Sequence, residues 1–229
     1  MKPPLSVYDV FGYLTSGFVV LAASDVAFAQ GWLAKGELPL LQGVAILVFT
    51  YVVGHAVAHL SSALLQDGLV HKLLGRPENV LFGSRRRGLV RSIFPGFFRP
   101  LPQQIRDAVM ARAGACGIGS VGQGLFMHCH AIVVREETIR QRLDVFLTLY
   151  GFARNLCLAA LLSGGVLAIG AFREARAGSP TAYGERLVWA SVFVLVAVIM
   201  LYRYLKFYRR YTSEVFRAYA VGDREKAGV

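Results

Sequence analysis

The sequence predicts an all-α membrane protein, a four-transmembrane-helix bundle whose helical extensions form a small cytoplasmic cap. Its 229 residues are 55% hydrophobic and only 17% charged, and their mean hydropathy is +0.49. Soluble domains contain about 45–50% apolar and about 25% charged residues, so this composition indicates lipid as the solvent. The 15 Phe, 10 Tyr and 2 Trp exclude a disordered chain, and three Cys are too few for a disulfide scaffold.

Four apolar stretches are long enough to cross about 30 Å of hydrocarbon, which takes about 20 helical residues. They cover residues 10–28, 40–60, 146–172 and 187–205. The first could be a secretory signal, because Ala27-Phe28-Ala29 has the A-x-A form of a cleavage site. Only one Lys precedes it, after which come two Pro and a long apolar core, so we expect an uncleaved span.

These spans divide the chain into four parts. We expect a first transmembrane hairpin (1–65), a basic cytoplasmic region (66–145), a second transmembrane hairpin (146–206) and a cytoplasmic tail (207–229).

The distribution of Lys and Arg predicts the orientation. Residues 66–146 hold twelve Lys and Arg against six acids, and the tail from Arg203 onward holds seven against three. Basic loops stay in the cytoplasm, so both termini are expected there, in a bacterial inner membrane. The net charge of +11 follows from this asymmetry, and we therefore expect no nucleic-acid partner. The Cys residues would lie in the bilayer or on its reducing side, which makes disulfides unexpected.

Apolar stripes predict that three of the helices continue beyond the bilayer. The stripe of the second span runs on from Leu60 to Leu74, before Gly75 and Pro77 stop the helix. A helical pattern begins at Glu136 and leads into the third span. The fourth span continues in the same way to Phe216.

The region between the hairpins contains shorter elements. Residues 103–113 have the pattern of a short helix, and the glycine-rich residues 114–124 that of a loop. Residues 125–134 fit either a buried strand or a hydrophobic connector. Before them lies a basic and aromatic segment, which could lie at the level of the lipid headgroups or form a solvated loop against the bundle. Its members are Arg85, Arg86, Arg87, Phe94, Phe97 and Phe98.

Several polar residues are expected at membrane depth, where an ionisable side chain is costly unless it has a partner. This intramembrane polar cluster comprises Asp9, His55, His59, Ser62, Arg154 and Asn155. We expect Arg154 to lie within hydrogen-bond reach of Asp9 or of the two histidines. Such a cluster would clamp the helices together, or form a site that responds to protons or a ligand. The third alternative is that Arg154 snorkels to headgroup phosphates.

Metal sites have weaker support. His55 and His59 have the spacing of half a helical metal pair, but the membrane enzymes with such pairs need a larger set than the five His present. Gly43 and Gly54 instead fit small residues that let helices approach closely. Weak zinc candidates are Cys116, His128, Cys129 and His130. They lack the usual ligand spacing, so we expect no metal or other cofactor.

Three segments carry a resemblance to a known group of proteins. These are YGFARNL at Tyr150–Leu156, GHAVAHLSS at Gly54–Ser62, and RYLKFYRRYTSEVFRAY from Arg203. Together they resemble a family of uncharacterised small bacterial four-span membrane proteins, and some similar proteins act as anti-phage membrane effectors. The resemblance implies the four-span architecture and marks no catalytic residue.

These features favour a non-enzymatic integral membrane protein. The leading hypothesis is a homo-oligomeric membrane effector or channel-like protein that alters permeability, with the lipid bilayer and other copies of the chain as partners. One alternative is a lipid- or isoprenoid-modifying membrane enzyme that uses His55 and His59. Another is a membrane adaptor whose basic cap docks a cytoplasmic protein partner.

Overall fold

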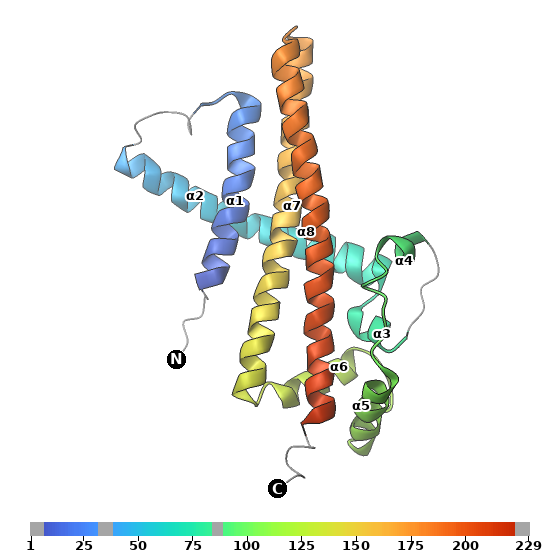
Figure 1. Cartoon of the computed structure of the whole chain (residues 1–229). Helices are drawn as coiled ribbons and strands as arrows, with labels where there is room; N and C mark the ends of the chain where they lie inside the picture. The colour runs from blue at the N-terminus through green and yellow to red at the C-terminus, as the bar shows by residue number, and fades with distance from the viewer. Residues whose placement is uncertain (1–6, 32–38, 84–88, 223–229) are drawn as a thin grey trace. The chain divides into compact units, whose positions relative to one another are not determined.

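The computed structural model describes residues 7–31, 39–83 and 89–222, except for the side chains of residues 7–9 and 11. All regular structure in these ranges is helical (Figure 1). The elements are α1 (Val7–Phe28), α2 (Leu40–Ser61), the π-helix η1 (Ser62–Leu74), α3 (Pro77–Leu81), α4 (Leu89–Ile93), α5 (Gln103–Ala115), α6 (Gln123–Val133), α7 (Glu137–Arg176) and α8 (Pro180–Val221).

Three helical segments in the described ranges are long and apolar enough to cross a membrane. They are Leu40–Leu81, Glu137–Arg176 and Pro180–Val221, while the apolar part of α1, Gly12–Phe28, is shorter. The predicted membrane class therefore stands with three candidate spans. In the most apolar stretch of α7, 56% of the residues are buried, whereas in the corresponding stretches of the other two segments only 17% are buried. Thus α7 is the most enclosed of the three.

Three helices continue past the ends of their predicted spans. The helix that begins with α2 continues through η1 to Leu74 and ends before Gly75, whose φ of 94° is in the left-handed region. Helix α7 begins at Glu137, and α8 continues without a break to Val221. Both are about twice as long as a membrane span requires, with 40 and 42 residues.

The strand considered for residues 125–134 is wrong, because this segment forms α6. Its three buried side chains, Leu125, Cys129 and Val133, are four residues apart. They therefore share one face of a helix, whereas a buried strand face would need a spacing of two. The helix predicted for residues 103–113 is present as α5, which continues to Ala115. The loop predicted for residues 114–124 is shorter than expected, because α5 includes Gly114 and α6 begins at Gln123.

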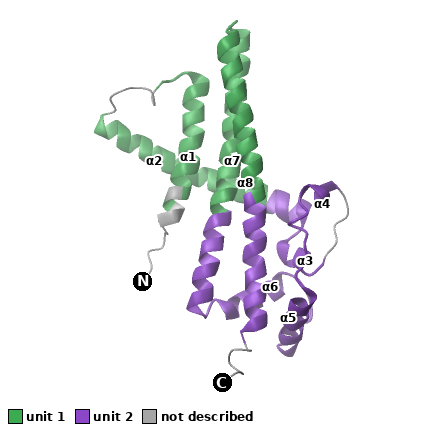
Figure 2. Ribbon diagram, viewed as in Figure 1, with its two compact units in different colours: residues 1–66, 151–202 green, residues 67–150, 203–229 purple. Residues whose placement is uncertain are grey.

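The chain folds into two compact units (Figure 2). Unit 1 contains residues 1–66 and 151–202, and unit 2 contains residues 67–150 and 203–229. Helices α7 and α8 contribute residues to both units.

Unit 1 packs largely through small residues. Its buried cluster consists of Ala23, Ala27, Leu167 and Ala190. The Ser163 hydroxyl donates a hydrogen bond to the Val19 carbonyl oxygen at 3.2 Å, and Gly170 packs directly on Ala27. Since the residue numbers rise together, α1 and α7 run in the same direction. In membranes small residues allow such backbone approach, and close packing replaces the hydrophobic drive.

Helices α1 and α2 cross at two glycines (Figure 1). A Cβ on Gly17 would lie 1.9 Å from the carbonyl oxygen of Thr50, and one on Gly54 would lie 2.0 Å from that of Tyr13. Real Cβ contacts are essentially never shorter than 3.0 Å. The close approach expected at Gly54 is therefore present. At Gly43 it is not, because no described atom lies within 4 Å of a Cβ there.

Unit 2 has a core of large apolar side chains from five of its elements. Its fully buried members are Leu81, Leu101, Val109, Ala113, Leu125, Cys129, Val133, Leu143, Val215, Phe216 and Tyr219. Phe82 packs edge-on against Phe216 with ring centroids 5.0 Å apart. Burial of such apolar side chains away from water is the dominant favourable contribution to folding in most proteins.

The α1–α2 crossing yields a first prediction. Gly54→Ala should destabilise the protein by about 3 kcal/mol or more, the upper end for overpacking, because the methyl group would meet backbone rather than a movable side chain. Thermal unfolding in detergent, together with the yield of monodisperse protein, measures the effect. The matched control is Gly43→Ala on the same helix, which should be neutral or stabilising by up to about 1 kcal/mol. Equal behaviour of the two variants would contradict the crossing.

Candidate functional site

Arg154 of α7 lies half-buried in unit 1 and donates hydrogen bonds to four side-chain oxygens. Its Nε donates to Ser61 Oγ at 3.1 Å, and its Nη1 to Ser62 Oγ at 3.4 Å and Gln66 Oε1 at 2.5 Å. Its Nη2 donates to Asn155 Oδ1 at 3.4 Å. The guanidinium thus joins α7 to the junction of α2 and η1.

Ser61 ties this cluster to the backbone. Its hydroxyl is fully buried and lies 2.7 Å from Asn155 Oδ1 and 2.8 Å from the Ala58 carbonyl oxygen. A hydroxyl has one proton and two lone pairs, so Ser61 can accept from Arg154 while it donates to one of these oxygens. The arrangement holds the guanidinium in one orientation.

The change from α-helix to π-helix at Ser62 shapes the acceptor side of the cluster. In a π-helix the backbone bonds connect residues five apart, which widens the turn. Ser61 and Gln66 are five apart and both contact the guanidinium. π-Helical segments are rare in proteins, and those that occur are often found at functional sites. The α2–η1 junction is therefore a candidate functional position.

All four oxygens that accept from Arg154 belong to neutral side chains. An arginine side chain stays protonated in proteins. Within the part of the chain that the structure describes, the positive charge is therefore solvated by dipoles rather than neutralised by an acid.

The other members of the predicted cluster lie apart from these bonds. Asp9 belongs to α1, but its side chain is outside the described residues, so an Asp9–Arg154 ion pair stays a prediction. The two histidines are exposed, and neither is a hydrogen-bond partner of Arg154 in the described region. His55 instead stacks on Tyr13, with ring centroids 4.1 Å apart, and meets Tyr51 edge-on at 4.6 Å.

Sequence reasoning missed Ser61, Gln66 and the two tyrosines. Gln66 could have been found, because His55, His59, Ser62 and Gln66 follow the four-then-three spacing of one helix face. Ser61 lies off that face in a regular α-helix, and only the wider turn of η1 brings it to Arg154 beside Gln66. Tyr51 lies four residues before His55 on α2, so the helical spacing could have indicated it, whereas Tyr13 lies on α1 and no local pattern indicates it.

The basic and aromatic segment is only partly described, since Arg85, Arg86 and Arg87 lie outside the described residues. Two of its rings are buried in unit 2, with exposed fractions of 4% for Phe97 and 7% for Phe98. Phe94 is half-buried. The two buried rings contact protein, as in the loop that packs against the bundle.

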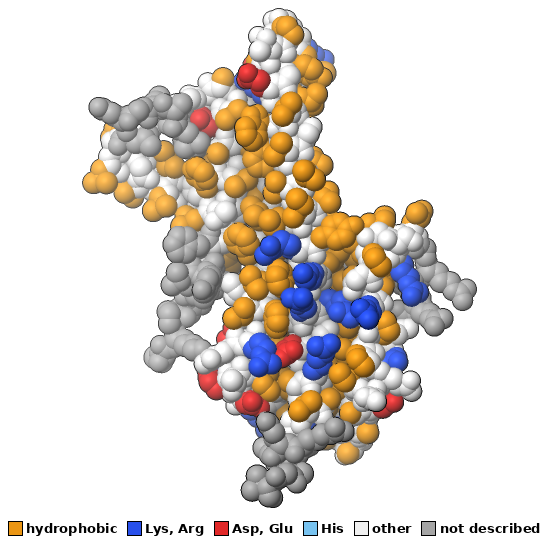
Figure 3. Space-filling model, viewed as in Figure 1, with side chains coloured by type: hydrophobic (Ala, Val, Ile, Leu, Met, Phe, Trp, Pro, Cys, Tyr) orange, Lys and Arg blue, Asp and Glu red, His pale blue; other side chains and the backbone are white. Residues whose placement is uncertain are grey.

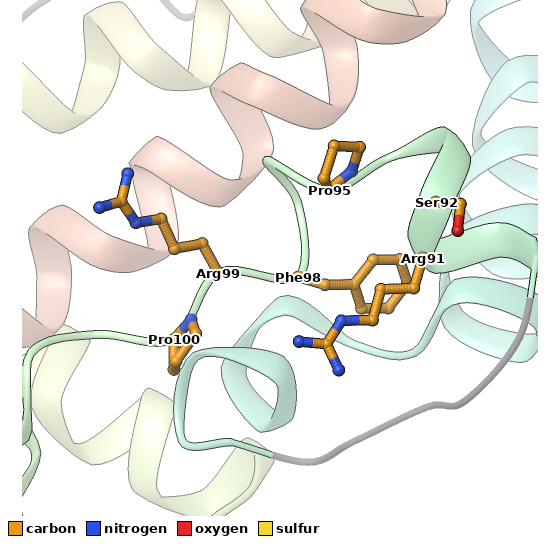
Figure 4. A pocket seen from close by; sticks show the side chains of 6 residues that line it. All are labelled: Arg91, Ser92, Pro95, Phe98, Arg99 and Pro100. Carbon is orange, nitrogen blue, oxygen red and sulfur yellow. The ribbon is translucent and has the colours of Figure 1, made fainter.

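A pocket of about 430 Å³ lies beside this segment (Figure 4). Its lining residues are Arg91, Ser92, Pro95, Phe98, Arg99 and Pro100. The side chains of Arg91 and Arg99 extend in different directions and do not converge on one point (Figure 4).

The weak zinc candidates are dispersed around α5 and α6. Cys116 is exposed, and His128 Nε2 lies 3.2 Å from the Tyr219 hydroxyl oxygen. Cys129 is fully buried, and burial raises the pKa of its thiol to about 12. Burial also lowers the pKa of His130. No three His, Cys, Asp or Glu side chains of the described ranges gather as a metal site.

Comparison of the chain with protein-family models, with curated proteins and with solved structures found no match in any of the three.

The geometry around Arg154 yields a second prediction. Arg154→Ala should reduce the amount of folded protein more than Arg154→Lys, because Ala leaves buried oxygens without a donor, whereas Lys keeps the charge but loses the planar fork. Loss of one such charged hydrogen-bond donor costs about 1.5–3 kcal/mol. Unfolding midpoints in detergent rank the variants. If Arg154→Ala proved as stable as wild type, the clamp would be disproved.

Proposed function

We propose that the protein is a homo-oligomeric, non-enzymatic membrane protein that alters the permeability of a bacterial inner membrane. The observation that carries the proposal is the Arg154 charge, which is held on neutral oxygens within an apolar unit. A charged group at membrane depth is costly, and such residues commonly mark pathways for ions or substrates. A positive charge without a described acid partner favours anions over cations in its vicinity.

Self-association has support in α2. The first half of this helix is apolar and widely exposed, with fractions of 85% for Leu40, 56% for Leu47 and 57% for Phe49. The close backbone approach to α1 comes after it, at Thr50 and Gly54. The exposed half of α2 would pack against lipid or against another copy, and symmetric assembly is the usual solution for such faces.

The proposed topology has four spans, with both termini and unit 2 in the cytoplasm. It is supported by the parallel course of α1 and α7, because the first and third of alternating spans cross in the same direction. It also follows the excess of Lys and Arg in unit 2 and in the tail. Arg154 would then lie toward the cytoplasmic end of the third span.

A third prediction concerns permeation. In liposomes the protein should pass chloride faster than potassium, and Arg154→Gln should lower this ratio. A unit charge about 10 Å from an ion path contributes roughly 1–2 kcal/mol at an effective dielectric constant of about 20. The effect has opposite signs for the two ions, so each flux should change about ten-fold and their ratio about 100-fold. Chloride-quenched dye and potassium electrode readings measure the two fluxes.

The control for that experiment is the double variant Arg186→Gln, Glu174→Gln. Arg186 Nη1 and Glu174 Oε1 form an ion pair of 2.5 Å in unit 1, so removing both leaves the net charge unchanged. Its flux ratio should equal that of wild type. Tight liposomes with folded protein, or a strictly monomeric species in nanodiscs, would refute the proposed function.

A fourth prediction tests the topology with an impermeant maleimide on intact spheroplasts. In wild type the exposed Cys116 should react only after lysis. In the Cys116→Ser, Ser179→Cys variant, the new thiol in the α7–α8 turn should react before lysis. Cys129 and Cys157 are buried and give little background, since the thiolate is the reactive form and the pKa of Cys129 is raised. The reverse labelling order would invert the topology.

A further inference from the structure

Unit 2 contains a pocket of about 350 Å³ between α7 and the last turns of α8. Phe146 of α7 forms one wall, and the other lining residues are Arg209, Arg210, Ser213, Glu214 and Arg217. The α8 residues lie beyond the apolar stretch of that helix, which ends near Leu205. Arg209, Ser213 and Arg217 are four residues apart, so they line one face of α8. Three arginines therefore contribute to the lining of one small cavity.

Two polar atoms of this pocket lack hydrogen-bond partners among the described residues. They are the hydroxyl oxygen of Ser213 and the Nε of Arg209, and both are buried. Ser213 has an exposed fraction of only 5%. A buried polar atom without a partner is costly, so native proteins rarely keep one without a reason. Both residues line the cavity, so a small side-chain rotation would bring these atoms to a ligand bound there.

The charges of the pocket are unbalanced. Glu214 is the only acid among the described lining residues, and its Oε1 accepts a hydrogen bond of 2.7 Å from Arg142 Nη1 outside the pocket. The Arg209 guanidinium is fixed by a 2.5 Å bond from Nη2 to the Arg99 carbonyl oxygen. Burial, followed by the charges of Arg217, Arg99 and Arg210, lowers the pKa of Arg209. Figure 3 shows the surrounding face of unit 2 with many Lys and Arg side chains and few acids.

We infer that this pocket binds the phosphate group of a phosphate ester. A phosphate monoester carries a charge of about −1.5 to −2 at neutral pH and three acceptor oxygens. Guanidinium groups bind such oxygens through paired N–H donors, and Ser213 supplies a neutral hydroxyl donor. A carboxylate would need only one guanidinium fork, so it would leave most of the donors unused. Phe146 offers an apolar wall for the organic part of the ester.

The pocket in Figure 4 carries no comparable argument, because its two guanidinium groups diverge and no unpartnered atom lies among its lining residues. The phosphate site lies wholly in unit 2 and does not depend on the proposed permeability function.

The test uses the full chain in phosphatidylcholine nanodiscs and follows its unfolding midpoint. Two probes share one phosphate monoester headgroup: glycerol 3-phosphate in solution and phosphatidic acid in the nanodisc. A rise with glycerol 3-phosphate assigns a soluble ester to the site, whereas a rise with phosphatidic acid alone assigns a lipid headgroup. Either rise supports the proposal if the variants respond as follows.

Ser213→Ala should weaken the binding of whichever probe raises the midpoint about ten-fold, as expected for loss of a hydrogen bond to a charged group. Without a probe it should be no less stable than wild type, because its hydroxyl has no partner there. Arg217→Gln should weaken the binding of that probe at least as much. Lys206→Gln removes a charge from an exposed position on α8 outside the pocket and should bind like wild type. Absence of a shift with both probes, or equal weakening by Lys206→Gln and Ser213→Ala, would overturn the inference.

Discussion

The backbone crossing of α1 and α2 is the constraint on which unit 1 depends. With hydrogen atoms as the only side chains at Gly17 and Gly54, the two helices come close enough for each glycine to rest on a carbonyl group of the other helix. This crossing fixes the course of α2, and the course of α2 in turn brings Ser61, at the end of that helix, to the Arg154 guanidinium. The polar cluster therefore exists where it does because two residues far from it have no Cβ.

Unit 1 and unit 2 differ in the interactions that stabilise the interior of each. Unit 1 is joined by alanine and glycine contacts and by a few buried hydrogen bonds, as expected where lipid replaces water and removes the hydrophobic drive between helices. Unit 2 buries leucine, valine and aromatic side chains in a core of its own. The same two helices, α7 and α8, contribute residues to both units, and in α7 the small residues Ala159, Ala160, Ser163, Gly164 and Gly170 all lie in the unit 1 part.

Composition and periodicity predicted the helical class, the candidate spans of α2, α7 and α8, and their long extensions, because these depend on local patterns. The α1–α2 crossing and the acceptors of Arg154 depend on which helices meet, which no local pattern states. Gly54 was predicted as a point of close approach, but Gly17, its counterpart, was not. At residues 125–134 the continuous apolar run concealed a helical spacing of four, since strands and buried helix segments of this length have the same hydrophobic pattern.

The guanidinium of Arg154 is a fixed positive charge, as the arginine side chain is in proteins generally. In an energised membrane such a charge experiences a force from the transmembrane voltage, worth about 2.3 kcal/mol per 100 mV for a complete crossing and proportionally less for a partial one. Four neutral oxygens anchor it to the α2–η1 junction and to Asn155. An electrical force on this one side chain would therefore act on the place where α2 changes to the π-helix η1.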